Sequence, residues 1–118
     1  MNRRKVFLEI VLWTLTLLLA WMFLQQGWAK FDDRSGWASA FALWHYPRWF
    51  RLVIGALELG AALLLLVRPV AFLGAAIIIA IMLGAMATHV RWHHPSQVKS
   101  EVVPLVLATT IFAARLRR

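Results

Sequence analysis

The stretch LVIGALELGAALLLLVRP, residues 52–69, is apolar almost without interruption, yet Glu58 lies close to its middle. It is typical of the whole chain, because 62% of the 118 residues are hydrophobic and the mean hydropathy is +0.71. Soluble domains are about 45–50% apolar, and a water-soluble fold of this length buries too little surface to hide the excess. The composition therefore predicts an integral membrane protein, in which lipid surrounds the apolar side chains.

Four stretches are long enough to cross a hydrocarbon core about 30 Å thick, which takes roughly 20 residues of helix. The expected helices cover residues 6–28, 49–67, 70–90 and 98–118. The last is the weakest, since its purely apolar part is residues 102–114, and it spans only if Lys99 and Arg115 reach outward to the headgroups. The prediction is an all-α fold, an integral membrane four-helix bundle that forms a single transmembrane domain over residues 1–118.

The connections between the expected helices differ in length. Arg68-Pro69 joins the second helix to the third with almost no loop, which makes these two helices antiparallel neighbours. The link between the first two helices is longer and aromatic, and its rings recur with the period of one helical face at Trp37, Phe41 and Trp44. Ser35 is placed to cap this segment. Because aromatic rings prefer the membrane interface, we predict a short interfacial helix over residues 36–45.

The net charge of +8 does not indicate nucleic-acid binding, because the lysines and arginines gather at helix ends rather than along one face. Such basic ends anchor helices at a lipid surface, so the predicted partner is the lipid bilayer and not nucleic acid. Four crossings place both termini on the same side. The basic clusters at the two termini favour the cytoplasm for that side, in a bacterial-type inner (cell) membrane.

Catalytic patterns are missing from the sequence. The chain has no cysteine, which excludes disulfides, a thiolate nucleophile and iron–sulfur ligation by cysteine. A phosphate-binding loop and a nucleophile triad are absent as well. No catalytic residue is predicted, and any chemistry must use carboxylates, histidines or a bound cofactor.

Small residues indicate where helices meet. In the second expected helix Gly55 and its small neighbours surround Glu58, and the third carries a stripe of small residues at spacings of four: Ala76, Ala80, Gly84 and Thr88. Membrane helices associate by close contact between such surfaces. The stripe predicts packing within the bundle, and it offers a surface for a homodimer.

Glu58 is the most informative polar residue. It lies nine residues from Trp49, or roughly 13 Å deep at about 1.5 Å per residue. An ionised carboxylate at that depth is costly unless paired. Two arrangements are open, a neutral Glu58 bonded to Gln25, Gln26 or Thr109, or an ion pair with Lys30. Either arrangement suits a functional site or a simple tie between helices.

Methionine and histidine follow one face of the third helix and its end. Met82, Met86, His89 and His93 are spaced by four, three and four residues, and thioether and imidazole groups bind copper or haem iron. No complete ligand set accompanies them, and RWHHPSQVKS is typical of an interfacial loop with hydrated histidines. We therefore predict no metal or haem site.

Four blocks together resemble the DoxX-like family of small four-helix membrane proteins, related to DoxX and to the DoxD subunit of thiosulfate:quinone oxidoreductase. The blocks are FLQQGWAKF, GWASAFALWHYPRWF, IGALELGAALLLLVRP and GAAIIIAIMLGAMATHV. The resemblance covers residues 7–118 and implies a set of family positions: Gly27, Lys30, Pro47, Gly55, Glu58, Met82, Gly84 and His89. One departure is His45, where the family pattern has glycine before Tyr-Pro.

The resemblance implies an accessory or quinone-interacting component of a membrane redox system, with quinone as the cofactor and a redox subunit as the partner. In that interpretation Glu58 belongs to a buried polar pocket together with Lys30, Gln25, Gln26, Thr109, Met82 and His89. Two alternatives stay open. One is a small transporter or proton-relay module, since buried carboxylates also build relays. The other is a structural membrane protein that acts through helix contacts and has no ligand.

Overall fold

The protein is all-helical in a computed structural model that describes residues 2–92 and 95–116, and the side chains of residues 95–100 lie outside that description. The elements are α1 (Arg3–Ala29), α2 (Gly36–Leu43), α3 (Arg48–Leu65), the short 3-10 helix η1 (Arg68–Val70), α4 (Ala71–Arg91) and α5 (Pro95–Leu116). No β-strand occurs in the part of the chain that the structure describes. The predicted all-α class is therefore confirmed.

The four long helices correspond to the four expected ones, with shifted ends. The first extends to Arg3, the last begins at Pro95 instead of residue 98, and the expected residues 117–118 lie outside the described part. By length and composition, two described segments, Arg3–Ala29 and Arg68–Arg91, could cross a membrane. Helix α3 has 18 residues and includes Arg48, Arg51 and Glu58. The number of crossings in a membrane bundle thus stays a prediction.

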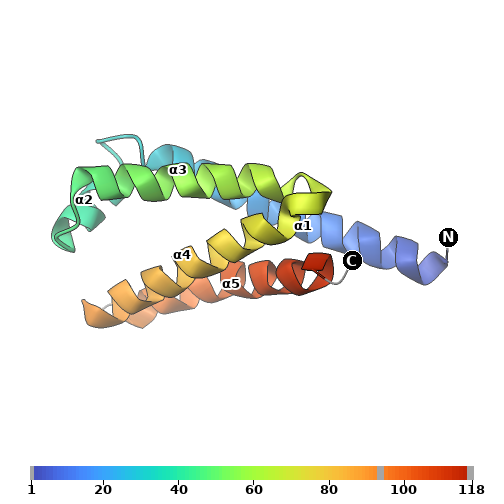
Figure 1. Cartoon of the computed structure of the whole chain (residues 1–118). Helices are drawn as coiled ribbons and strands as arrows, with labels where there is room; N and C mark the ends of the chain where they lie inside the picture. Colours follow the sequence, from blue (N-terminus) through green and yellow to red (C-terminus); the bar gives the residue numbers. More distant parts are fainter. Residues whose placement is uncertain (1, 93–94, 117–118) are drawn as a thin grey trace.

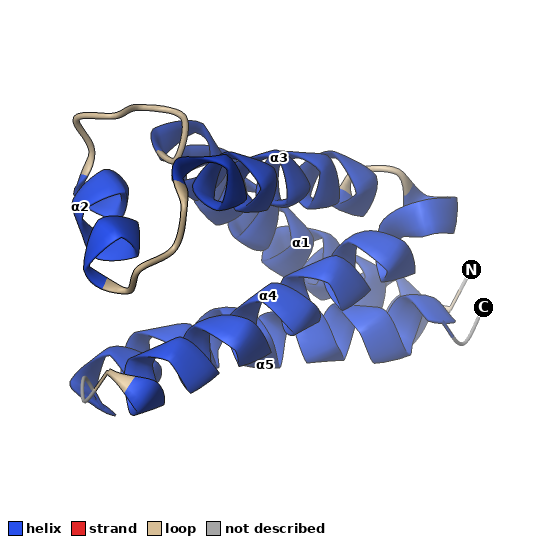
Figure 2. Cartoon of the chain, turned by 60° about the vertical axis from the view of Figure 1, so that its left-hand side comes forward, coloured by secondary structure: helices blue, strands red, loops and turns tan. Residues whose placement is uncertain are grey.

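The helices form two antiparallel pairs. Helix α1 packs along α3, and α4 packs along α5 (Figure 1). The pairs meet near η1, where both labelled termini also lie, and they diverge toward the end that carries α2 (Figures 1 and 2). The expected contact between the helices joined by Arg68-Pro69 is confirmed, because α3 packs against α4. The divergence leaves room between the pairs at the α2 end.

Two glycine contacts hold the helices close. A Cβ atom on Gly27 of α1 would lie 2.9 Å from the Gly55 carbonyl oxygen of α3, and a Cβ on Gly55 would lie 3.0 Å from the Gly27 oxygen. On α4, a Cβ on Gly74 would lie 2.5 Å from the Ala61 carbonyl oxygen. Any larger residue would push the backbones apart at these three positions. Small residues here serve the close packing of membrane-type helices.

The predicted small-residue stripe on α4 does not pack against a neighbouring helix along its length. A Cβ on Gly84 would meet no atom within 4 Å, and Ala80 and Gly84 are exposed, whereas Thr88 is buried. The physical reason is the divergence of the two helix pairs, which moves the facing backbone away from this part of α4. The prediction of bundle packing is therefore wrong for Ala80 and Gly84.

The core lies where the two helix pairs converge. Leu19, Phe23, Leu65, Ile78 and Ile111 are fully buried there. In contrast, many large apolar side chains face outward; Phe7 is 64% exposed, Trp28 74% and Val90 64%. So large an apolar surface is unusual for a soluble monomer. It suits a protein whose outer surface contacts lipid.

Candidate functional site

A cavity of about 1070 Å³ lies between the diverging helix pairs. Its wall is formed by the end of α1, by α2, and by the facing sides of α3, α4 and α5. Aromatic rings of Trp37, Phe41 and Trp44 from the α2 segment line it together with aliphatic side chains of α3 and α4. This combination of size and apolar wall is typical of small-molecule sites.

An ion pair between Lys30 and Glu58 lines one side of the cavity. Lys30 is the C-cap of α1, and its Nζ lies 2.5 Å from Glu58 Oε1 of α3. The Lys30 ammonium also lies 3.8 Å from the centre of the Trp37 ring, which adds a cation–π contact. Glu58 is fully buried and Lys30 is 3% exposed. Of the two arrangements left open for Glu58, the structure has the ion pair.

Three polar residues named as alternative partners lie elsewhere or make no contact with the carboxylate. Gln25 is exposed and Gln26 lines the cavity. Thr109 is exposed, and its hydroxyl donates to the Leu105 carbonyl oxygen at 2.8 Å. The reason is rotation of the helix: Ala108 on α5 faces the core, which turns Thr109 outward. The expectation that Gln25 and Thr109 share a pocket with Glu58 is wrong.

A second pair of a basic and an acidic residue, His89 and Glu101, lines the cavity on the side of α4 and α5. His89 Nδ1 of α4 contacts Glu101 Oε1 of α5, close enough for an ion pair when the imidazole is protonated. Both residues are 7% exposed, and the His89 ring packs edge-on to Trp44, with 5.2 Å between ring centres. The histidines predicted to be hydrated are His93 and His94 of residues 91–100, and both lie outside the described residues. The sequence predicted no role for Glu101. In the structure it lies in the first two turns of α5, where it faces His89 of α4.

A hydroxyl pair joins the aromatic segment to α4 beside the cavity. Tyr46 Oη lies 2.8 Å from Thr88 Oγ1. Because the Thr88 hydroxyl donates to the Gly84 carbonyl oxygen at 2.9 Å, Tyr46 is the donor in this pair. The preceding residue, His45, has φ 62°, in the left-handed region. Glycine adopts this conformation without strain, which is consistent with the glycine that the resemblance described above implies at this position.

Polar groups outside the cavity hold the end of α1 against α3. The Arg51 guanidinium, 4% exposed, donates to the Lys30 carbonyl oxygen at 2.8 Å, to the Asp32 carbonyl oxygen at 3.2 Å and to Asp33 at 2.6 Å. Hydrogen bonds from Arg48 and Arg51 lower the pKa of Asp33 from 3.8 to about 2. Because Arg51 bonds to the Lys30 carbonyl oxygen, it positions Lys30 for Glu58.

Ser35 occupies the N-cap position of α2, but its side chain makes no capping bond and donates instead to the Asp32 carbonyl oxygen.

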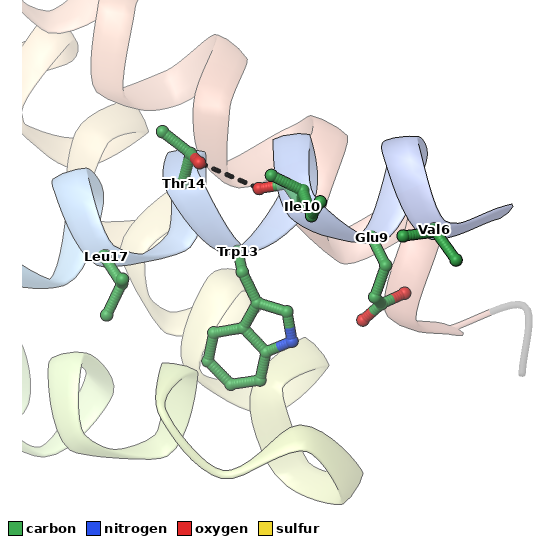
Figure 3. Close-up of a pocket in the computed structure, with 6 residues that line it drawn as sticks. All are labelled: Val6, Glu9, Ile10, Trp13, Thr14 and Leu17. Carbon is green, nitrogen blue, oxygen red and sulfur yellow. Dashed lines mark hydrogen bonds between the residues drawn. The ribbon is translucent and has the colours of Figure 1, made fainter. Parts of the chain in front are cut away.

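A smaller hollow of about 370 Å³ lies at the opposite end of the molecule, along α1. Glu9 and Trp13 project from the same side of α1, and the Thr14 hydroxyl donates to the Ile10 carbonyl oxygen (Figure 3). Glu9 also pairs with Arg115 at 2.7 Å and Arg68 at 3.7 Å. These contacts join the helix ends near the termini. The hollow contains none of the predicted site residues, so the cavity beside Glu58 is the candidate site.

The methionine and histidine face of α4 contributes Met82 and His89 to the cavity wall. Met82 is buried and Met86 is half-buried, while His93 lies outside the described residues. Within the described ranges, no group of three or more histidine, cysteine, aspartate or glutamate residues could hold a metal ion.

The sequence model of the DoxX-like family matches residues 14–113. The chain belongs to the DoxX-like family. The matched range of this DoxX-like chain includes both basic–acidic pairs of the cavity, Lys30–Glu58 and His89–Glu101. No curated protein and no solved structure matches the chain. Family membership and the two apolar helices support a membrane protein.

Proposed function

We propose that this DoxX-like protein binds a quinone in the cavity beside Glu58 and serves as an accessory component of a membrane redox system. A quinone head group is a flat, largely apolar ring with polar oxygens at its edge. The wall of the cavity offers the matching surfaces, with the rings of Trp37, Phe41 and Trp44 for the ring faces and the Lys30–Glu58 pair for an oxygen.

One observation carries the proposal, namely that both residues of a buried ion pair belong to the wall of a large cavity. Burial of two charges costs several kcal/mol per ion before their attraction is counted. A pair that only ties α1 to α3 gains nothing from an adjacent cavity of about 1070 Å³. A ligand whose polar oxygen lies beside the pair would use both features.

The test is an organic extract of the protein, purified in mild detergent and analysed by chromatography with absorbance detection. Glu58→Gln is purified in parallel, with Thr109→Val as a matched control because Thr109 lies off the cavity. The expected result is stoichiometric quinone in the native protein and in Thr109→Val, and a lower quinone content in Glu58→Gln. Native protein without quinone, which also fails to take up added quinone, would refute the proposal.

A proton-relay or transport function is the second candidate, favoured by the two carboxylates on opposite sides of one cavity. Glu58 lies on α3 and Glu101 on α5, each beside a basic side chain. In that case proteoliposomes would show pH-dependent flux that Glu101→Gln reduces. Flux without quinone binding would favour this candidate over the first.

A purely structural protein without ligand is the third interpretation, and both a redox subunit and a homodimer stay predictions. Stable partners would be found by cross-linking in native membranes. The α4 stripe is a poor homodimer surface, because Ala80 and Gly84 line the cavity. Contacts between copies would instead use the outward apolar faces.

For the membrane topology we propose four crossing helices, with α2 at the interface and both termini in the cytoplasm of a bacterial-type inner membrane. Both termini lie at the end of the molecule opposite α2 (Figure 1). Reporter fusions at Arg68 and at residue 34 test this arrangement. A cytoplasmic signal at residue 34 and an external one at Arg68 would reverse the proposed orientation.

A further inference from the structure

Three buried polar atoms of residues that line the cavity have neither a hydrogen bond nor an ion-pair contact among the residues that the structure describes. They are Glu58 Oε2, Glu101 Oε2 and Trp44 Nε1. Glu58 is fully buried and Glu101 is 7% exposed. A buried polar atom without a partner costs about 1–3 kcal/mol, and more when it is charged. These three atoms therefore define what the cavity requires of a ligand.

The requirement is two hydrogen-bond donors and one acceptor. Carboxylate oxygens accept hydrogen bonds, and the indole N–H of Trp44 only donates. The basic neighbours are already engaged: the Lys30 ammonium contacts Glu58 Oε1 and the Trp37 ring, and His89 contacts Glu101 Oε1. The groups of the wall that still lack a partner are therefore two hydrogen-bond acceptors and one donor.

The two redox forms of a quinone differ in this property. An oxidised quinone has carbonyl oxygens, which accept but never donate. The reduced form, a hydroquinone, has two hydroxyl groups, each of which donates one hydrogen bond and also accepts. Only the hydroquinone can donate a hydrogen bond to an ionised carboxylate oxygen, whereas both forms can accept a bond from Trp44.

We infer that the cavity binds the reduced, dihydroxy form of its ligand in preference to the oxidised form. The inference rests on the proposed quinone function and adds a redox preference to it. A hydrogen bond to a charged group contributes about 1.5–3 kcal/mol, so one such bond corresponds to a preference of about tenfold or more. Tighter binding of the reduced form raises the midpoint potential of the bound ligand, by about 30 mV for each tenfold in a two-electron couple.

The test uses a benzoquinone with a ten-carbon tail, and its hydroquinone, with the full-length protein in lipid nanodiscs. Binding of each form is measured at fixed pH, and the midpoint potential of the bound probe is compared with that in protein-free nanodiscs. The expected result is hydroquinone binding at least tenfold tighter than quinone binding, with a corresponding positive shift of the potential. Equal binding, or tighter binding of the quinone, would overturn the inference while leaving the proposed function intact.

Three variants separate the groups on the wall. Glu101→Gln and Glu58→Gln are each expected to reduce the preference for the hydroquinone, because each replaces a carboxylate that only accepts by a side chain that also donates. Trp44→Phe removes one donor and is expected to weaken both forms equally, which leaves the ratio unchanged. Thr109→Val is expected to change neither affinity. A preference that survives in both carboxylate variants would refute the assignment.

One control separates the effect of the lost carboxylate from that of the unpaired Lys30 charge. Because Glu58→Gln leaves Lys30 without its charged partner, Lys30→Met/Glu58→Gln is measured beside it, and it is expected to show the same loss of preference. If neither redox form binds to the native protein, the proposed function fails and this inference fails with it.

Discussion

Removal of the Lys30 side chain should destabilise the protein strongly. The side chains of Lys30 and Glu58 are only 4% and 1% exposed, so the energetics of buried pairs apply. Loss of one partner from such a pair costs about 3–5 kcal/mol, because the remaining charge is left uncompensated. We therefore expect Lys30→Met to lower the free energy of unfolding by about 3–5 kcal/mol, and Lys30→Met/Glu58→Leu to regain most of this loss.

The assay is unfolding of the purified protein in mild detergent by increasing amounts of a denaturing detergent, followed by circular dichroism. Arg48→Gln is the matched control, because it removes one partner of the Arg48–Asp33 pair, whose side chains are 63% and 61% exposed. This control should lose much less stability than Lys30→Met, because exposed pairs contribute about 0–1 kcal/mol. Equal losses for Lys30→Met and Arg48→Gln, or no recovery in the double variant, would refute the description of Lys30–Glu58 as a buried pair.

Three further predictions concern the backbone and the loop. His45→Gly should unfold with a free energy about 1 kcal/mol higher than His45→Ala, because the left-handed conformation at φ 62° costs about 1–2 kcal/mol for a residue with a Cβ; equal values in the same unfolding assay would contradict this. Gly74→Ala should lower the free energy of unfolding by about 1–3 kcal/mol through overpacking, because its Cβ would lie 2.5 Å from a carbonyl oxygen. Gly60→Ala is the control: its Cβ would meet no atom within 4 Å, so it should raise the free energy of unfolding by about 1 kcal/mol. A loss of stability in Gly60→Ala equal to that in Gly74→Ala would contradict this. The bonds of Asp33 should stabilise the protein above its unfolded pKa of 3.8 and lose this effect as the pH falls toward its folded pKa of about 2; unfolding curves of Asp33→Asn measured across that window should lack this pH dependence, and a dependence equal to that of the native protein would assign it to another group.

The sequence was sufficient to predict the depth of the polar residues but not the direction in which they point. Lys30 was identifiable as a partner of Glu58 because a long side chain at a helix end reaches a carboxylate about two turns deep. Thr109 lies at a suitable depth as well, yet it faces outward because Ala108 occupies the inner face of α5. The rotation of a nearly uniformly apolar helix depends on its neighbours, which a single sequence does not show.

The same limit applies to small residues. Gly55 and Gly84 look equivalent in sequence, since each directly precedes an alanine in an apolar helix. Gly55 approaches the α1 backbone, whereas a Cβ on Gly84 would meet nothing within 4 Å. A small side chain permits a close helix contact and equally well widens a cavity. The divergence of two helix pairs, which decides between these roles, is a property of the whole fold.

The segment that carries α2 is fastened unequally at its two ends. Before α2, the buried Arg51 guanidinium makes three bonds to the chain at Lys30, Asp32 and Asp33. After α2, the Tyr46–Thr88 hydroxyl pair joins the segment to α4, together with ring contacts of Trp44 with His89 and of His45 with Trp92. Movement of the segment would therefore meet less resistance on the α4 side of the cavity than on the α3 side, where the buried Arg51 guanidinium holds the chain.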